Sequence, residues 1–286
     1  MQRAGEWSWS GGSGVEYQTT HYLLRTTVTD VQTVERFARL LESALKEYHA
    51  LIPGLPESKR PLIVYLFARH DEWASYTVET AGDNADLYLQ VYAGGYTVRD
   101  RFVCWIGNEP DTLSLTAHEG FHQFVGRHFL LRLPPALEEG LATTFEHVTI
   151  TGSGATFATD TNHRRRTALR YAVEGNYLIP LSTLVQLHAG DLIDRPVALR
   201  EGFYAQCWAL ACFLRDDSRY AARFRQYLLD TAQGNLAQDV GRADGTSVYH
   251  PARVQPVLEK ALAAPWTEIE AAYLRHLKTL INTDVD

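Results

Sequence analysis

Five consecutive residues combine side chains that bind metal ions with one that can accept a proton. Residues 118–122 read His-Glu-Gly-Phe-His. In a helix, positions i and i+4 lie one turn apart on the same face, so His118 and His122 can present imidazole nitrogens to one metal ion. Glu119 lies beside them, where a carboxylate can take a proton from metal-activated water. The segment therefore supplies two candidate ligands and a candidate general base for hydrolysis.

The surrounding residues favour a helix over roughly 111–129. Asp111 or Thr112, just after Pro110, can cap its start. Gly120 is unusual there, because glycine costs about 1 kcal/mol relative to alanine in a helix interior. We therefore expect another part of the chain to pack closely against Gly120. The alternative is a purely structural helix whose histidines pair with carboxylates. Apolar side chains recur at helical spacing along the segment: Leu113, Ala117, Phe121, Phe124 and Val125.

A catalytic zinc site needs a third protein ligand and keeps one position open. The next segment with apolar residues at helical spacing is 135–147. Pro134 and Pro135 stand at its start and suit the first turn of a helix. Glu138 and Glu139 follow in that turn, where either carboxylate also stabilises the helix dipole. Only one of two adjacent carboxylates can face a given site, and the residues alone leave both open.

The two segments together resemble the gluzincin peptidases, and within them the bacterial peptidase-MA-like group. The resemblance rests on H-E-G-F-H followed by P-x-L-x-E-G-L-A-x-x-F-E. It implies a zincin-like α+β fold, one zinc ion per chain, Glu139 as the third ligand beside His118 and His122, and a peptide or protein substrate. The chain departs from the group at Ala136, where an aromatic is common. The longer zinc motif with a third histidine fails, because Val125 stands where it needs glycine.

A downstream stretch extends the resemblance. Residues 203–215 match the Y-x-Q-x-W-x-L-x-x-F-L helix of the group and begin with Phe203-Tyr204. Gluzincins typically supply a donor to the reaction's oxyanion from a later helix, which makes Tyr204 our candidate, with His163 and His188 as rivals. Carboxylates that orient the zinc-binding histidines are also expected. The candidates are Asp160, Asp191 and Glu146.

These features predict a zinc-dependent peptidase with Glu119 as general base. The G-x-M-E-N exopeptidase motif of one large gluzincin aminopeptidase group is absent, since the single methionine is Met1. Its absence favours an endopeptidase or an enzyme of narrow specificity. One alternative is a zincin-fold binding protein without turnover. Another is a zinc hydrolase of a non-peptide amide or ester.

Bulk composition bounds the partners. The net charge of −7 over 286 residues argues against a nucleic-acid or anionic-membrane surface. The one basic run, Arg164–Arg166, is expected to be solvated or to form intramolecular salt bridges, in preference to binding a polyanion. No apolar run is long enough for a membrane span, and the first residues lack the apolar core of a signal peptide. The chain is thus either not exported or lacks its signal here, and the oligomeric state is open. Three cysteines are expected as buried thiols: Cys104, Cys207 and Cys212.

The periodicity predicts a mixed α+β organisation. We expect a flexible Gly/Ser-bearing lead-in at 1–16, an α+β sheet subdomain at 17–110 and a helical subdomain at 111–286, with the active site in a cleft between the two subdomains. Residues 87–93 and 99–106 are expected as strands, the latter as the substrate-binding edge strand. Residues 149–161 are expected as a loop. Further helices are expected near 163–175, 181–189, 198–215, 218–232, 251–263 and 265–281.

Overall fold

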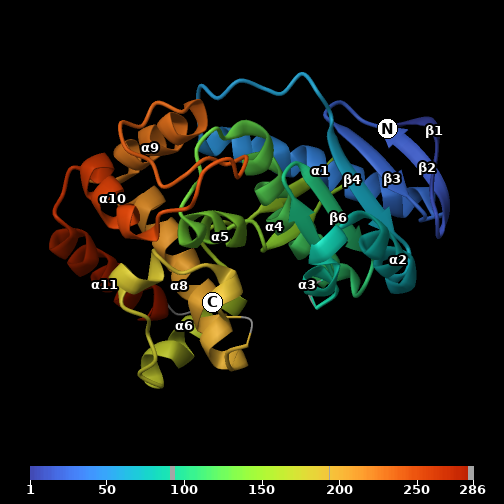
Figure 1. Ribbon diagram of the computed structural model, residues 1–286. Coiled ribbons are helices and arrows are strands. Elements are labelled where there is room, and N and C mark those ends of the chain that lie inside the picture. Colours follow the sequence, from blue (N-terminus) through green and yellow to red (C-terminus); the bar gives the residue numbers. More distant parts are fainter. Residues whose placement is uncertain (91–93, 193, 283–286) are drawn as a thin grey trace. The chain divides into compact units, whose positions relative to one another are not determined.

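The computed structural model describes residues 1–90, 94–192 and 194–282, and confirms the α+β class (Figure 1). The chain divides into two compact units. Unit 1 comprises 1–50, 56–128 and 148–157, and unit 2 comprises 51–55, 129–147 and 158–286. The boundary expected at residue 110 moves to 128, because helix α4 (Glu109–His128) packs on strands of unit 1.

Unit 1 contains a mixed sheet with the strand order β1-β2-β3-β4-β6-β5. β3, β4 and β6 run parallel, whereas β1 pairs with β2, β2 with β3, and β5 with β6 in antiparallel fashion. β4 reads Leu-Ile-Val-Tyr-Leu-Phe and is almost entirely buried, as expected for a central strand. The bounds are β1 Gln2–Trp9, β2 Gly12–Gln18, β3 Tyr22–Thr26, β4 Leu62–Phe67, β5 Gly95–Val98 and β6 Arg101–Trp105.

The flexible lead-in expected at 1–16 is wrong, because these residues form the β1–β2 hairpin. Trp7 is buried and stacks on Trp9, with ring centroids 5.0 Å apart. Its edge also meets Tyr65 and Phe67 of the central strand at 5.5 and 5.9 Å. The two tryptophans bury enough apolar area to order a segment whose glycines and serines suggest flexibility.

Two expectations about strands are also corrected. Residues expected as an edge strand at 99–106 form β6, which lies inside the sheet between β4 and β5. The edge strand at this end of the sheet is β5. A tight turn joins β5 and β6, and Arg99 in this turn has a φ of 56°. The strand expected at 87–93 is helical where it is described, in α3 (Ala85–Leu89), and residues 91–93 lie outside the described part.

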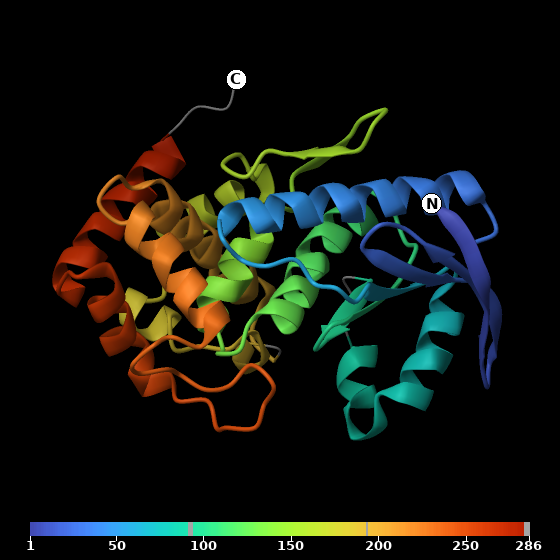
Figure 2. The same ribbon diagram turned by 90° about the horizontal axis from the view of Figure 1, so that it is seen from above.

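Helices and a small hairpin complete unit 1. Figure 2 shows α1 (Val31–Leu51) as a long helix beside α4, and the Tyr48 and Phe121 rings meet at 5.4 Å. The loop expected at 149–161 contains instead the hairpin of β7 (Val148–Ile150) and β8 (Ala155–Phe157), and the Ala155 amide donates to Ser43 Oγ at 3.1 Å. The remaining elements are α2 His70–Thr80 and the short 3₁₀ helix η1 Gly82–Asn84.

Unit 2 is mainly helical, as the periodicity predicts. α5 ends at Thr143, earlier than expected, where the hydroxyls of Thr143 and Thr144 bind carbonyls three residues back. α8 (Val197–Asp216) is largely buried and carries two of the three cysteines, all of which are buried free thiols, as expected. The other bounds are α5 Pro135–Thr143, α6 His163–Glu174, α7 Leu181–Leu184, η2 Ala189–Leu192, α9 Ala221–Gln233, η3 Pro251–Arg253, α10 Val254–Leu262 and α11 Trp266–Asn282.

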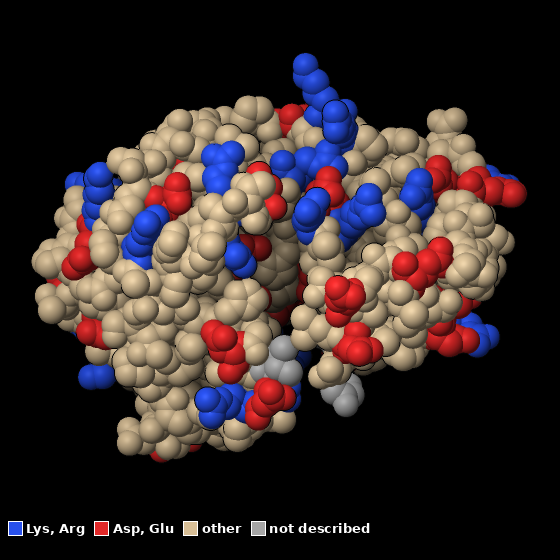
Figure 3. Space-filling view, viewed as in Figure 1, with Lys and Arg blue, Asp and Glu red and all other residues tan. Residues whose placement is uncertain are grey.

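The distribution of charged side chains and the length of apolar helices limit the kinds of partner. On the face shown in Figure 3, acidic and basic side chains are interspersed among uncharged residues. Among the described residues, no helix is both long and apolar enough to cross a membrane.

Candidate metal centre

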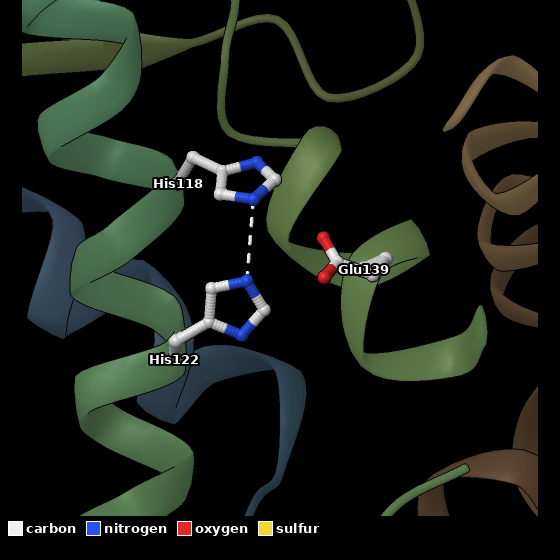
Figure 4. A group of neighbouring side chains, drawn as sticks. All are labelled: His118, His122 and Glu139. Carbon is white, nitrogen blue, oxygen red and sulfur yellow. Dashed lines mark hydrogen bonds between the residues drawn. The ribbon is translucent and has the colours of Figure 1, made fainter. Parts of the chain in front are cut away.

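His118 and His122 present the same ring nitrogen to each other from one face of α4. Their Nε2 atoms lie 3.2 Å apart, and both rings point to the same side of the helix (Figure 4). Zinc–imidazole bonds are about 2.0–2.1 Å long. An ion bound by two nitrogens 3.2 Å apart would therefore have an N–Zn–N angle of about 100–106°, close to tetrahedral. The pair predicted from the i, i+4 spacing therefore fits a zinc ion.

The opposite face of α4 is held by α1. At 100° per residue, Gly120 lies about 180° around the helix from the midpoint of the two histidines. Tyr48 Oη donates to the Ala117 carbonyl at 2.5 Å. A Cβ placed on Gly120 would lie 2.9 Å from Tyr48 Oη. The close packing expected at Gly120 is confirmed, and Tyr48 is the side chain responsible.

Strands of unit 1 fix the remaining sides of α4. Thr97 Oγ1 of β5 donates to the Glu119 carbonyl at 3.0 Å. The buried Gln123 amide donates to the carbonyls of Ile63 and Asp100 at 2.7 and 2.8 Å. These bonds set both the height and the rotation of the helix, and thus the direction of its histidines.

The Glu119 side chain is half-buried near two weak acids of the core. Burial raises the pKa of the Tyr48 phenol and of the Cys104 thiol, and the nearby charge of Glu119 raises both further. Both groups therefore stay neutral at neutral pH.

Glu139 completes a group that could hold a metal ion. His118, His122 and Glu139 each offer one ligand atom, and these atoms all lie within 4.8 Å of one another. Figure 4 shows the Glu139 carboxylate, carried by α5, pointing toward the two imidazoles. Of the two adjacent carboxylates, the described structure places Glu139, and not Glu138, in this group.

The packing of α5 on α8 sets the direction of Glu139. A Cβ on Gly140 would lie 2.2 Å from the Cys207 carbonyl oxygen and 3.1 Å from the Ala211 Cβ, so the backbones approach as closely as glycine permits. Cys207 also lies near Glu139, whose charge adds to burial in raising the pKa of the thiol. Neither the type nor the spacing of Cys207 indicates in advance that it faces α5.

Tyr204 lies one turn before Cys207 on α8, and positions three apart share a face. The Tyr204 side chain is half-buried, and its ring lies 5.0 Å from the Arg165 guanidinium carbon. The Phe203 ring meets it edge-on at 5.4 Å. The role of Tyr204 as an oxyanion donor stays a prediction.

The rival donors and the candidate orienting carboxylates have other contacts. His163 meets the His147 ring at 5.4 Å, and His188 is exposed and accepts from the Gly190 amide at 3.1 Å. Asp191 accepts from the His188 amide at 2.8 Å, and Glu146 binds Arg165 at 2.7 Å.

Asp160 lies close enough to Cys212 for its charge to add to the effect of burial in raising the pKa of that thiol. The structure thus gives Asp191 and Glu146 hydrogen-bond partners in unit 2, and the role of these two residues and Asp160 in orienting His118 and His122 stays a prediction. Arg165, in the basic run 164–166, is buried and forms ion pairs with Glu146 and Glu201.

Comparison with known protein families, curated proteins and solved structures found no match to this chain.

Proposed function

We propose that this protein is a zinc-dependent peptidase of the gluzincin type with a zincin-like fold. His118, His122 and Glu139 would hold one zinc ion per chain. The observation that carries the proposal is the pair of imidazole nitrogens 3.2 Å apart, with a Glu139 carboxylate oxygen within 4.8 Å of both. Two histidines and one glutamate are a ligand set used by catalytic zinc.

The bound ion supplies a Lewis acid that polarises the substrate carbonyl and lowers the pKa of water toward 7. Glu119 accepts the proton of the attacking water as the new C–O bond forms. It then delivers that proton to the nitrogen as the C–N bond breaks, so the products are a carboxylic acid and an amine. The Tyr204 hydroxyl donates to the oxygen that becomes negative in the transition state.

An extended peptide is the substrate class that the neighbouring strand favours. β5 is one of the two edge strands of the sheet, and the Thr97 hydroxyl within it donates to the Glu119 carbonyl. An edge strand offers main-chain donors and acceptors to an added strand. Binding along β5 would hold the peptide by its backbone, which suits an endopeptidase.

The test combines zinc content with turnover of a quenched fluorescent peptide library. We expect one zinc per chain, and cleavage that stops when the ion is removed and returns when it is restored. Full zinc content in His122→Ala would contradict the ligand assignment. His128→Gln, on the same helix but outside the ligand group, is the matched control and should retain the ion.

The same measurement separates the alternatives. Zinc at one per chain without cleavage of any peptide, but with turnover of simple amide or ester substrates, would indicate a non-peptide hydrolase. Zinc without turnover of either class would indicate a binding protein.

A further inference from the structure

Arg165 carries a positive charge inside unit 2, and its side chain is only 7% exposed. Its Nε and Nη2 bind the two oxygens of Glu146 at 2.9 and 2.7 Å, and its Nη1 binds Glu201 at 3.0 Å. Replacing a buried ion network by apolar residues is often neutral or stabilising, so stability alone does not account for such a group. Its geometry suggests a role in holding particular elements in place.

The network joins three helices. Glu146 follows the end of α5 and also accepts from the Asn162 amide at 2.9 Å. Asn162 in turn donates to the Thr143 carbonyl at the end of α5 and caps α6 by accepting from the Arg165 amide at 3.1 Å. The same arginine thus connects the end of the Glu139 helix with the start of α6 and, through Glu201, with α8.

The guanidinium also covers the candidate oxyanion donor. Glu201 and Tyr204 are three residues apart on α8 and share a face. With one guanidinium nitrogen fixed on Glu201, the Arg165 Cζ lies 5.0 Å from the Tyr204 ring centroid, within the range of a cation–π contact. Phe203 meets the ring from a second direction. Two neighbours therefore restrict the plane of the phenol, and with it the direction of the hydroxyl.

We propose that Arg165 is a positioning residue, which holds the Tyr204 ring and the end of α5 in the arrangement that the reaction needs. The inference rests on the proposed function, because it assumes that Tyr204 donates to the oxyanion. Arg165 acts through Tyr204 and does not itself contact the substrate. Lysine cannot replace it, since a single ammonium group cannot bind Glu146 through two parallel hydrogen bonds while covering the ring.

The test compares Arg165→Lys with Arg164→Ala in the full-length zinc-loaded protein. Arg164 is the adjacent residue, is 68% exposed and binds the other oxygen of the same Glu201 at 3.0 Å. Loss of an oxyanion donor typically lowers kcat by about 10²–10³-fold. Incomplete positioning should cost less, so we expect Arg165→Lys to lower kcat by roughly 10–100-fold with KM and zinc content nearly unchanged. Arg164→Ala should leave all three unchanged.

The decisive comparison uses Tyr204→Phe as background. If Arg165 acts through the Tyr204 hydroxyl, Arg165→Lys should cause no further loss of kcat there. A loss of the same size in both backgrounds would overturn the proposal and assign Arg165 a general structural role. Glu201→Gln keeps the shape of the network and is the second variant if Arg165→Lys does not fold. It should lower kcat in the same background-dependent way.

A readout without turnover separates this inference from the proposed function. With ring-labelled tyrosine, the Tyr204 resonance is identified by its absence in Tyr204→Phe. Arg165→Lys should shift that resonance, and Arg164→Ala should not. A shift in a protein that shows neither zinc binding nor turnover would sink the proposed function while retaining Arg165 as the residue that holds Tyr204. An unchanged resonance would overturn the positioning role.

Discussion

Tyr48 and Gly120 are in contact across two helices that are far apart in the sequence. The Tyr48 hydroxyl donates a hydrogen bond to the Ala117 carbonyl at 2.5 Å. A Cβ on Gly120 would lie 2.9 Å from the oxygen of that hydroxyl. Tyr48 is completely buried, so its ring has no free space into which to move. The middle residue of the H-E-G-F-H segment is therefore the point at which α1 supports the face of α4 opposite His118 and His122.

The first prediction tests this contact with Gly120→Ala. Overpacking typically costs about 1–3 kcal/mol, which we expect to exceed the gain in helix propensity of about 1 kcal/mol. In a Tyr48→Phe background the clashing oxygen is gone, and the nearest ring atoms lie 3.6–3.7 Å from the new Cβ. There Gly120→Ala should be neutral or stabilising. Urea unfolding of the four proteins in the cycle measures this, and additive effects would rule out the clash.

The second prediction is that Gly140→Ala destabilises more than Gly120→Ala. Its new Cβ would lie 2.2 Å from the backbone oxygen of Cys207, which cannot rotate away. α5 and α8 would have to separate, so we expect a loss of about 3 kcal/mol or more in the free energy of unfolding. Gly152→Ala is the control, because no atom lies within 4 Å of its Cβ position. Equal stability of Gly140→Ala and wild type would contradict the close approach of the two helices.

The third prediction separates the roles of Glu119 and the zinc ligands. Glu119→Gln removes the proton acceptor but keeps the size of the side chain. It should retain one zinc per chain and lower kcat by about 10²–10⁴-fold, the usual contribution of a general base. Zinc analysis and peptide cleavage on the same sample provide the check. Loss of the ion together with activity would show instead that Glu119 supports the site structurally.

The fourth prediction concerns removal of the metal. A ligand that binds only the folded state stabilises it by about 2.7 kcal/mol at a hundred times its Kd. Chelation should therefore lower the Tm of the wild-type protein, and added zinc should restore it. His122→Ala should show neither change, whereas His128→Gln should behave as wild type. A chelator-insensitive Tm in the wild type would argue against the metal centre.

The fifth prediction is a loss of stability in mild acid caused by His128. Burial, followed by the charges of His49 and Arg127, lowers the pKa of His128 to about 4. Its ordinary value is about 6.5, so between pH 6.5 and 4 the unfolded chain binds a proton that the folded protein does not, and stability falls as the pH falls.

Solvent reaches part of the His128 ring, so we expect a loss of about 1–2 kcal/mol, less than the full conversion of the shift. His128→Gln should flatten the pH dependence of the unfolding free energy in this range. The exposed His188→Gln should not alter it. Identical profiles for wild type and His128→Gln would exclude the histidine as the cause.

Local geometry is what the sequence determined by itself. The spacing of His118 and His122 places them on one face of any helix, and the apolar periodicity around them predicts that helix. Most helices of unit 2 follow from the same periodicity. These features depend on neighbours within a turn or two of the chain, which is the range over which backbone geometry is fixed.

Contacts between distant segments were decided only by the tertiary structure. Trp7 and Trp9 order a hairpin whose composition suggests flexibility. Their partners Tyr65 and Phe67 lie more than fifty residues away, so local sequence does not predict these contacts. The position of β5 as the edge strand likewise depends on which strands pair. Sequence periodicity carries no information about either choice.

The candidate site also has features that the sequence predicts and features that only the fold determines. The choice between Glu138 and Glu139 depends on the rotation of α5, which its packing on α8 at Gly140 and Cys207 determines. In the sequence Arg165 is one of three consecutive arginines, and only the fold buries it against Glu146 and Tyr204. A side chain's type and spacing define what chemistry it can do, whereas its partners, and hence its role, depend on elements that only the fold brings together.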